Sequence, residues 1–283
     1  MKQIATTWNC AQCVVSLESP IIVGILNVTP DSFSDGGKYE LAENAIRHSM
    51  RLFNDGAYIV DVGGESTRPS AVRISAEEQI ARVIPVIEGI RTQSSALISI
   101  DTTNSQVASA AINAGASIIN DVSAGVEDEE MFEVAAKTGA GLVLMHRRLP
   151  PELDEYSHEY DTPPVSNDII LDVMGWLESR ATAAITQGVQ KSSIALDPGL
   201  GFGKSVEQNW QLIREAGRIV ALGYPVFVGA SRKSFIGAST GIEVPELRDE
   251  ASVEVSIDLA QQGVQIFRVH NVAAHQRMLQ SQS

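Results

Sequence analysis

A short buried strand that runs into an acid and a glycine-rich turn is where the residue types first indicate chemistry. Residues 194–196 are apolar, too few for a helix and bounded by turn residues, which predicts a strand. Asp197 then stands at the carboxyl end of that strand, where parallel α/β folds bind ligands. Glycines at 199, 201 and 203 let the backbone approach a flat ligand closely, and Phe202 offers a ring face. The simpler alternative is an ordinary turn in which Asp197 caps the next helix.

Two known phosphate-binding motifs do not fit the spacing of this turn. A Walker phosphate loop needs glycine five residues before the Gly203-Lys204-Ser205 step, and Pro198 stands there. The dinucleotide-binding fingerprint needs a third glycine where Lys204 or Val206 stands. The turn is therefore interpreted as part of a different kind of binding site.

Polar side chains also follow most of the other predicted strands, and their types fall into two sets. Asp101, Asn120 and Asp197 carry acceptors, or an amide that both donates and accepts, which suits a flat heterocycle with N–H and C=O edges. Each of them alone is better explained as a helix cap or a charge at the rim. Polar residues at nearly every strand end favour a shared site.

The second set is suited to a phosphate group. Asn27, Arg268 and His270 come where the last predicted strands meet the first, which is the usual phosphate position in a closed parallel barrel. Arg68, Arg232 and Lys233 supply further positive charge. The net charge of −14 makes this local concentration of cations more informative, because an anionic ligand must be held against the overall field.

The elements that position these residues alternate regularly along the chain. Eight short apolar runs and eight stretches with helical spacing predict a (β/α)8 TIM barrel with a short N-terminal β-hairpin, while a doubly wound open sheet is the alternative fold. We expect a single domain over 1–283, with the hairpin in 1–20 and an extended loop at 146–167 after the fifth barrel strand. The predicted strands are 7–10, 13–17, 21–26, 58–62, 97–100, 117–119, 141–145, 193–196, 225–228 and 265–269. The predicted helices are 41–54, 77–92, 105–114, 128–138, 168–187, 206–221, 249–262 and 272–280.

Composition excludes several classes of protein. The chain has no apolar run long enough for a membrane span and no secretory signal, so a cytoplasmic location is expected. Its net charge of −14 argues against a general nucleic-acid or anionic-membrane surface. Cys10 and Cys13 form a lone C-x-x-C with no further ligands at zinc spacing, and they are interpreted as the tips of the hairpin.

Seven motifs together resemble those of the dihydropteroate synthase family, over almost the whole chain after Leu17 and in register with the predicted strands. They are GILNVTPDSFSDGG (24–37), DVGGESTRP (61–69), SIDT (99–102), AGASIIND (114–121), LDPGLGFGK (196–204), GASRKSFIG (229–237) and RVHNV (268–272). The resemblance implies a transferase that condenses 6-hydroxymethyl-7,8-dihydropterin pyrophosphate with 4-aminobenzoate, with Mg²⁺. It also implies a homodimer and competition by sulfonamides.

The resemblance also assigns residues to substrates, motif by motif. Asp101, Asn120, Asp197 and Lys233 would hold the pterin, with Asp101, Asp197 and Lys233 as the catalytic residues. Asn27, Arg268 and His270 would bind the pyrophosphate, with Asn27 also at the metal. Thr67, Pro69, Phe202, Lys233 and Ser234 would line the 4-aminobenzoate pocket. Two mobile loops, which carry Asp31, Phe33, Asp35 and Arg68, would close over the ligands.

The chain departs from the family pattern after the fifth barrel strand. Arg147-Arg148-Leu149-Pro150 stands where a turn with methionine and glycine is usual, and an acidic and aromatic loop follows at 151–164. This loop is either a modified lid or wall beside the pterin, or a tolerated surface insertion, and the surface insertion is favoured. Asn271 and Asn104 replace a usual aspartate and lysine.

Two other functions remain open from the sequence. A methyltetrahydrofolate:corrinoid methyltransferase would share the pterin pocket, but it does not need Lys233 or the predicted pyrophosphate set. A pterin-binding paralogue that has lost catalysis would bind the ligand without turning it over.

Overall fold

A nearly closed barrel of eight parallel strands forms the centre of the computed structural model, which describes residues 4–29, 38–162 and 164–280. The hydrogen-bonded order is β8-β7-β6-β5-β4-β3-β10-β9. A parallel bridge between Leu196 and Val226, with Leu196 N donating to Pro225 O at 2.9 Å, joins the two ends. The strands are β3 (Ile21–Asn27), β4 (Ile59–Gly63), β5 (Leu97–Asp101), β6 (Ile118–Asp121), β7 (Gly141–Met145), β8 (Ile194–Asp197), β9 (Phe227–Val228) and β10 (Ile266–Val269).

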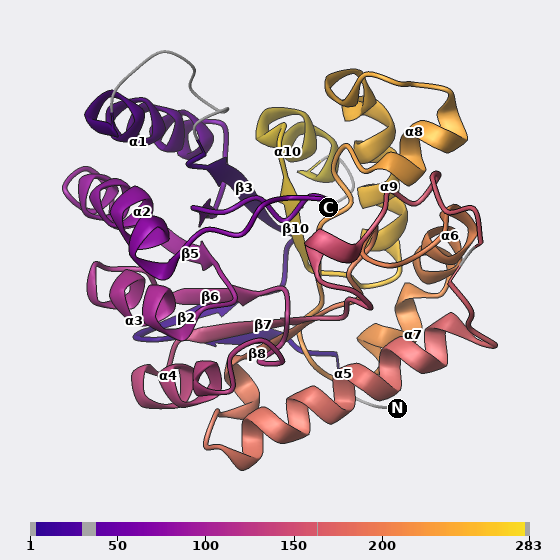
Figure 1. Cartoon of the computed structure of the whole chain (residues 1–283), viewed down its shortest axis with the longest axis horizontal. Coiled ribbons are helices and arrows are strands. Elements are labelled where there is room, and N and C mark those ends of the chain that lie inside the picture. The colour runs from indigo at the N-terminus through magenta and orange to yellow at the C-terminus, as the bar shows by residue number, and fades with distance from the viewer. Residues whose placement is uncertain (1–3, 30–37, 163, 281–283) are drawn as a thin grey trace.

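The barrel prediction is confirmed and the doubly wound sheet is excluded, because an open sheet would not join its first and last strands. Figure 1 shows the helices surrounding the strands. All eight predicted strands are present within about two residues of their predicted bounds, as expected for runs buried on both faces.

The helices follow the predicted spacing, with two differences. The stretch predicted as one helix over 206–221 is two helices, because the backbone at Glu215 has φ −113° and ψ 17° and interrupts the helix. A seven-residue helix at Ser234–Thr240 was not predicted. The helices are α1 (Lys38–Asn54), α2 (Ala76–Arg91), α3 (Ser105–Asn113), α4 (Glu130–Thr138), α5 (Ile169–Thr186), α6 (Val206–Arg214), α7 (Ala216–Val220), α8 (Ser234–Thr240), α9 (Asp249–Gln261) and α10 (Val272–Gln280).

The N-terminal hairpin covers the amino end of the barrel. Strands β1 (Thr7–Cys10) and β2 (Cys13–Ser16) pair antiparallel with Cys10 opposite Cys13, so the hairpin prediction is confirmed. Trp8 is fully buried and its indole Nε1 donates to Ser193 O at 2.8 Å. The apolar face of the hairpin packs against inward-pointing residues of all eight barrel strands. These are Ile21, Val23, Ile59, Leu97, Ile118, Val143, Ala195, Phe227 and Ile266.

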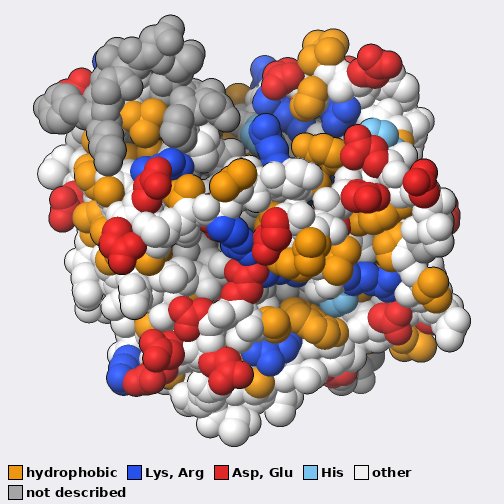
Figure 2. All heavy atoms as spheres, in the orientation of Figure 1, with side chains coloured by type: hydrophobic (Ala, Val, Ile, Leu, Met, Phe, Trp, Pro, Cys, Tyr) orange, Lys and Arg blue, Asp and Glu red, His pale blue; other side chains and the backbone are white. Residues whose placement is uncertain are grey.

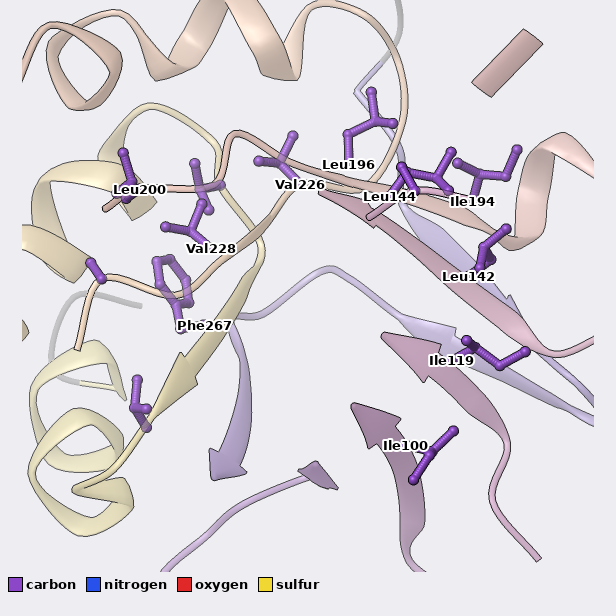
Figure 3. Packing of buried hydrophobic residues seen from close by; sticks show 14 of the residues in the cluster. Ile100, Ile119, Leu142, Leu144, Ile194, Leu196, Leu200, Val226, Val228 and Phe267 are labelled. Atoms are coloured by element: carbon purple, nitrogen blue, oxygen red, sulfur yellow. The ribbon is translucent and has the colours of Figure 1, made fainter. Parts of the chain in front are cut away.

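The outward faces of the same strands pack against the helices. Figure 3 shows Ile100, Ile119, Leu142, Leu144, Ile194 and Leu196 on neighbouring strands, and Val226, Val228 and Phe267 beyond them. The barrel therefore has apolar side chains on its outer face and in the part of its interior next to the N-terminal hairpin, here called the lower interior. Its upper interior is polar, because the inward positions two residues further along the strands include Asp61, Ser99, Asn120, Asp197 and Arg268.

The outer surface is of mixed character. Figure 2 shows acidic, basic and hydrophobic side chains interspersed over the face that is seen in Figure 1. None of the described helices is long and apolar enough to span a bilayer.

Candidate active site

A network of buried polar side chains fills the upper interior of the barrel. Arg268 on β10 donates from Nε to Asp61 Oδ2 at 2.6 Å and from Nη2 to Asp101 Oδ2 at 2.8 Å. Asn120 on β6 donates from Nδ2 to the same Asp61 oxygen at 3.1 Å. Strands β4, β5, β6 and β10 thus bring their acids and their arginine to one level of the barrel.

Asp61 is a site residue that the sequence did not assign. It is fully buried in the middle of β4, and its carboxylate joins Arg268 to Asn120. The sequence offered one signal, which is a carboxylate on an inward position of a strand predicted to be buried on both faces. Such an acid must have a partner inside the protein, because an unpaired buried charge is very costly.

Several polar atoms of this layer have no hydrogen bond within the described structure. They are Asp61 Oδ1, Ser99 Oγ, Asp101 Oδ1 and Asn120 Oδ1, and all are buried. Buried polar groups are normally paired, so a cluster of unpaired acceptors indicates a place for a ligand with several N–H donors. Burial and the neighbouring Asp61 raise the pKa of Asp101, although Arg268 acts in the opposite direction.

Asp197 ends β8 and is held by the turn that follows it. Its Oδ1 accepts from Gly199 N at 2.7 Å. Burial raises the pKa of this carboxyl to about 6, although the Gly199 N–H and the charges of Lys233 and Lys204 oppose the shift. Gly199 itself is at φ 66°, and a Cβ there would lie 1.9 Å from His146 O, so only glycine fits.

Lys204 was considered only as part of a phosphate loop, and the structure gives it a different role. It is fully buried, and its Nζ donates to the backbone oxygens of His146, Gly199 and Phe202 at 3.1, 2.8 and 2.9 Å. Burial lowers the pKa of this amine to about 7. Lys204 therefore fixes the backbone of the glycine-rich turn through these three hydrogen bonds.

Lys233 lies between the turn and the acidic layer. Its Nζ is 3.9 Å from the centroid of the Phe202 ring, and its side chain runs along Gly201, where a Cβ would lie 3.1 Å from Lys233 Cδ. Burial, followed by repulsion from Arg268, lowers the pKa of Lys233 to about 8, while Asp197, Asp154 and Asp101 act in the opposite direction. The structure thus brings Lys233, Phe202 and Asp197 together.

The predicted pyrophosphate residues lie at the same end of the barrel. The Ser231 hydroxyl is 3.0 Å from His270 Nδ1 and accepts from His270 N at 3.2 Å. In the tautomer with the ring hydrogen on Nε2, Nδ1 accepts from this hydroxyl. Burial, then Arg232 and Arg268, lower the pKa of His270 to about 3, so the ring is neutral at neutral pH. Asn27 ends β3 next to Gly63, where a Cβ would lie 3.6 Å from Asn27 Oδ1 and 3.7 Å from Asp101 Oδ2.

The predicted aminobenzoate residues lie on three separate elements. Thr67 and Pro69 are partly exposed in the loop after β4, with Arg68 exposed between them. Phe202 lies in the turn after β8, and Ser234 begins α8. Asp31, Phe33 and Asp35 lie outside the described residues.

Two residues of the 151–160 segment contact the turn after β8 and the start of α8. Asp154 and Ser157 are each only 4% exposed. Asp154 Oδ2 accepts from Gly203 N at 3.0 Å, and Ser157 N donates to Ser234 Oγ at 3.3 Å. Most of the described loop residues are exposed, as the favoured interpretation of a surface insertion expects, but Asp154 and Ser157 anchor the loop to these two elements.

Arg147, Asn104 and Asn271, at the other departures from the family pattern, have structural partners. Arg147 pairs with Glu127, which also pairs with Arg73. Asn104 caps α3 by accepting from two backbone N–H groups. Asn271 donates to Asp249 at 2.8 Å.

Comparison with known proteins gives consistent results. A family model described as pterin binding enzyme matches residues 23–270. Dihydropteroate synthase of Streptococcus pyogenes serotype M3 is 46% identical over 256 residues, which is 90% of this chain and 91% of that protein. A structure of Xanthomonas albilineans dihydropteroate synthase with 4-aminobenzoic acid is 40% identical with a TM-score of 0.90, and the match covers 98% of this chain and 97% of that one. A Thermus thermophilus dihydropteroate synthase in complex with 6HMPPP is 34% identical with a TM-score of 0.82, and the match covers 98% of both chains.

Proposed function

The chain belongs to the dihydropteroate synthase family of pterin-binding transferases, and we propose that it condenses 6-hydroxymethyl-7,8-dihydropterin pyrophosphate with 4-aminobenzoate to give 7,8-dihydropteroate and pyrophosphate. The observation that carries this assignment is the layer of unpaired buried acceptors in the barrel. A pterin has an exocyclic amino group and ring N–H groups along one edge, which are donors for such acceptors. Asp101, Asn120 and Asp197 are the proposed pterin-binding residues, and we add Asp61 to this set.

The proposed reaction breaks the bond between the exocyclic CH₂ of the pterin and the pyrophosphate. The electron-rich dihydropterin can carry the developing positive charge, so a dissociative substitution needs no protein nucleophile. Asp101 and Asp197 are fixed acceptors that favour positive charge on the ring. Arg268 and His270 would stabilise the negative charge that develops on the leaving group, His270 by donating from Nε2–H.

Mg²⁺ fits this site as a partner of the substrate. No group of three or more His, Cys, Asp or Glu side chains in the described part of the chain could hold a metal by itself. Mg²⁺ commonly uses one or two protein oxygens together with substrate phosphates and water, and the Asn27 amide oxygen suits that set. When bound, it would take up negative charge on the leaving pyrophosphate.

The second substrate needs orientation more than activation, because an arylamine is a weak nucleophile. Phe202 and Lys233 offer a ring face and an ammonium 3.9 Å apart, which suits an aromatic carboxylate. Thr67, Pro69 and Ser234 are the other proposed wall residues. That arrangement also supports competition by sulfonamides.

The test is release of pyrophosphate by the purified protein from the dihydropterin pyrophosphate, with and without 4-aminobenzoate. We expect release that depends on 4-aminobenzoate, yields dihydropteroate and stops when EDTA removes Mg²⁺. Binding of the pterin pyrophosphate without any product would instead identify a paralogue that has lost catalysis.

Arg268→Lys should raise the KM for the dihydropterin pyrophosphate about tenfold or more. Lysine keeps the charge but lacks the planar guanidinium that Asp61 and Asp101 hold in place and that can bond a phosphate from two nitrogens; a tenfold effect corresponds to about 1.4 kcal/mol. Steady-state kinetics with each substrate varied in turn measures it. The matched control is Arg214→Lys, in an exposed pair with Glu207. An effect confined to 4-aminobenzoate would contradict the assignment of Arg268.

We also propose a homodimer and a cytoplasmic location for the protein. The family resemblance supports the first. The same resemblance supports the second.

A further inference from the structure

We propose that the 151–160 segment positions the walls of the aminobenzoate site, with Asp154 and Ser157 as its positioning residues. The inference rests on the proposed function, since it concerns the second substrate. The segment belongs to the part of the chain that departs from the family pattern. It follows β7 and contacts each of the three elements that carry proposed aminobenzoate residues.

Asp154 holds the turn after β8. Its Oδ2 accepts from Gly203 N at 3.0 Å, and its Oδ1 accepts from the Tyr160 hydroxyl at 2.5 Å. Both carboxylate oxygens are thus used, in a side chain that is 4% exposed. Gly203 directly follows Phe202, so this bond fixes the backbone that carries the aromatic ring of the proposed site.

Ser157 connects the same turn to the start of α8. Its backbone N donates to Ser234 Oγ at 3.3 Å, and its hydroxyl oxygen accepts from Asn209 Nδ2 at 3.1 Å. Asn209 Oδ1 in turn accepts from Gly201 N at 2.6 Å. The glycine-rich turn is therefore held at Gly201 through Ser157 and at Gly203 through Asp154.

The beginning of the segment reaches the third wall. Pro151 O accepts from Ser70 N at 2.8 Å, and Glu152 forms an ion pair with Arg73 at 3.2 Å. Both partners lie in the loop after β4 that also carries Thr67. The segment thus contacts the loop after β4, the turn after β8 and the start of α8. These three elements follow different barrel strands, and the segment links them to one another. Asp154 also contributes negative charge that favours the protonated form of Lys233.

The experiment compares Asp154→Leu with Asp154→Asn, because the two side chains have similar volumes and only asparagine keeps an oxygen for Gly203. We expect Asp154→Leu to raise the KM for 4-aminobenzoate about tenfold, and the KM for the dihydropterin pyrophosphate less than about twofold. Asp154→Asn should stay within about threefold of the wild type for both substrates. Tyr160→Phe removes one hydroxyl and should raise the KM for 4-aminobenzoate about two- to fivefold.

Asp161→Leu and Asp161→Asn are the matched controls, because Asp161 is an exposed aspartate in the same loop. An Asp154→Leu protein that behaves like Asp161→Leu, or in which both KM values rise equally, would overturn the proposal. If Asp154→Leu does not fold, Tyr160→Phe decides by the same two KM values. Failure of the proposed function is distinguishable, since the wild type itself would then form no dihydropteroate, and the inference would fall with it.

Discussion

Replacing Lys233 with methionine should lower kcat/KM by about 10²- to 10³-fold, while the midpoint of thermal unfolding changes little or rises. The ammonium lies over the Phe202 ring, which is proposed to contact 4-aminobenzoate, and near Asp197 and Asp101, which are proposed to bind the pterin. Lys233 is therefore placed to contact both substrates. Methionine has a similar length and no charge. Lys137→Met is the matched control, since Lys137 is 71% exposed on α4.

The expectation for stability follows from the pKa of Lys233. Burial lowers it to about 8 from an ordinary value of 10.5, so the folded protein binds this proton less tightly than the unfolded chain does. The positive charge therefore costs folding free energy at neutral pH, and removing it should not destabilise the fold. A large drop in the unfolding midpoint with unchanged turnover would show that Lys233 has a structural role instead.

The same pKa predicts the alkaline limb of the pH profile. The wild-type kcat/KM should fall above about pH 8, because Lys233 loses its charge there. The limb should be missing from Lys233→Met.

The strands were predictable because each is buried on both faces of the barrel wall. A continuous apolar run bounded by turn residues, such as Gly141–Met145, then identifies the strand and its end. Helix α8 was not predictable in the same way. It has only seven residues and no side-chain cap at Lys233, so its sequence carries little helical signal.

The candidate site was predictable where a residue ends a strand, and it was missed where the environment depends on tertiary contacts. Asp101, Asn120 and Asp197 come at or next to the last residue of β5, β6 and β8, so a pattern of strand ends finds them. Asp61 lies in mid-strand, and it meets Arg268, 207 residues away, because β4 and β10 lie on either side of β3 in the barrel wall. Their roles toward the two substrates stay predictions.

The contacts of the 151–160 segment could not be read from the sequence for a related reason. Loops are usually exposed and variable, so an acidic and aromatic insertion was expected at the surface. The bond from Gly203 N to Asp154 exists because the turn after β8 presents an N–H group that a buried backbone must satisfy. The sequence of the 151–160 segment alone, or of the turn after β8 alone, does not show that the two are bonded to each other.

Asp197→Asn should lower kcat/KM by about 10²-fold or more and stabilise the protein at neutral pH. Asparagine still offers an oxygen to Gly199 N, but it does not place a negative charge beside the pterin ring. Asp161→Asn, at an exposed position, is the matched control. Steady-state kinetics and thermal unfolding at several pH values measure the two effects.

The gain in stability follows from the direction of the Asp197 shift. Burial raises the folded pKa to about 6 from an ordinary value of 3.8, so the folded state holds this proton more tightly than the unfolded chain. Ionisation of Asp197 therefore reduces the free energy of unfolding as the pH rises from about 4 to about 6, and the reduction persists above that range. The shift corresponds to a gain of about 1–3 kcal/mol for Asp197→Asn near pH 7.5, which should vanish toward pH 4. An asparagine variant that is less stable at pH 7.5, or that keeps its turnover, would contradict the view that this buried charge is retained for catalysis at a cost in stability.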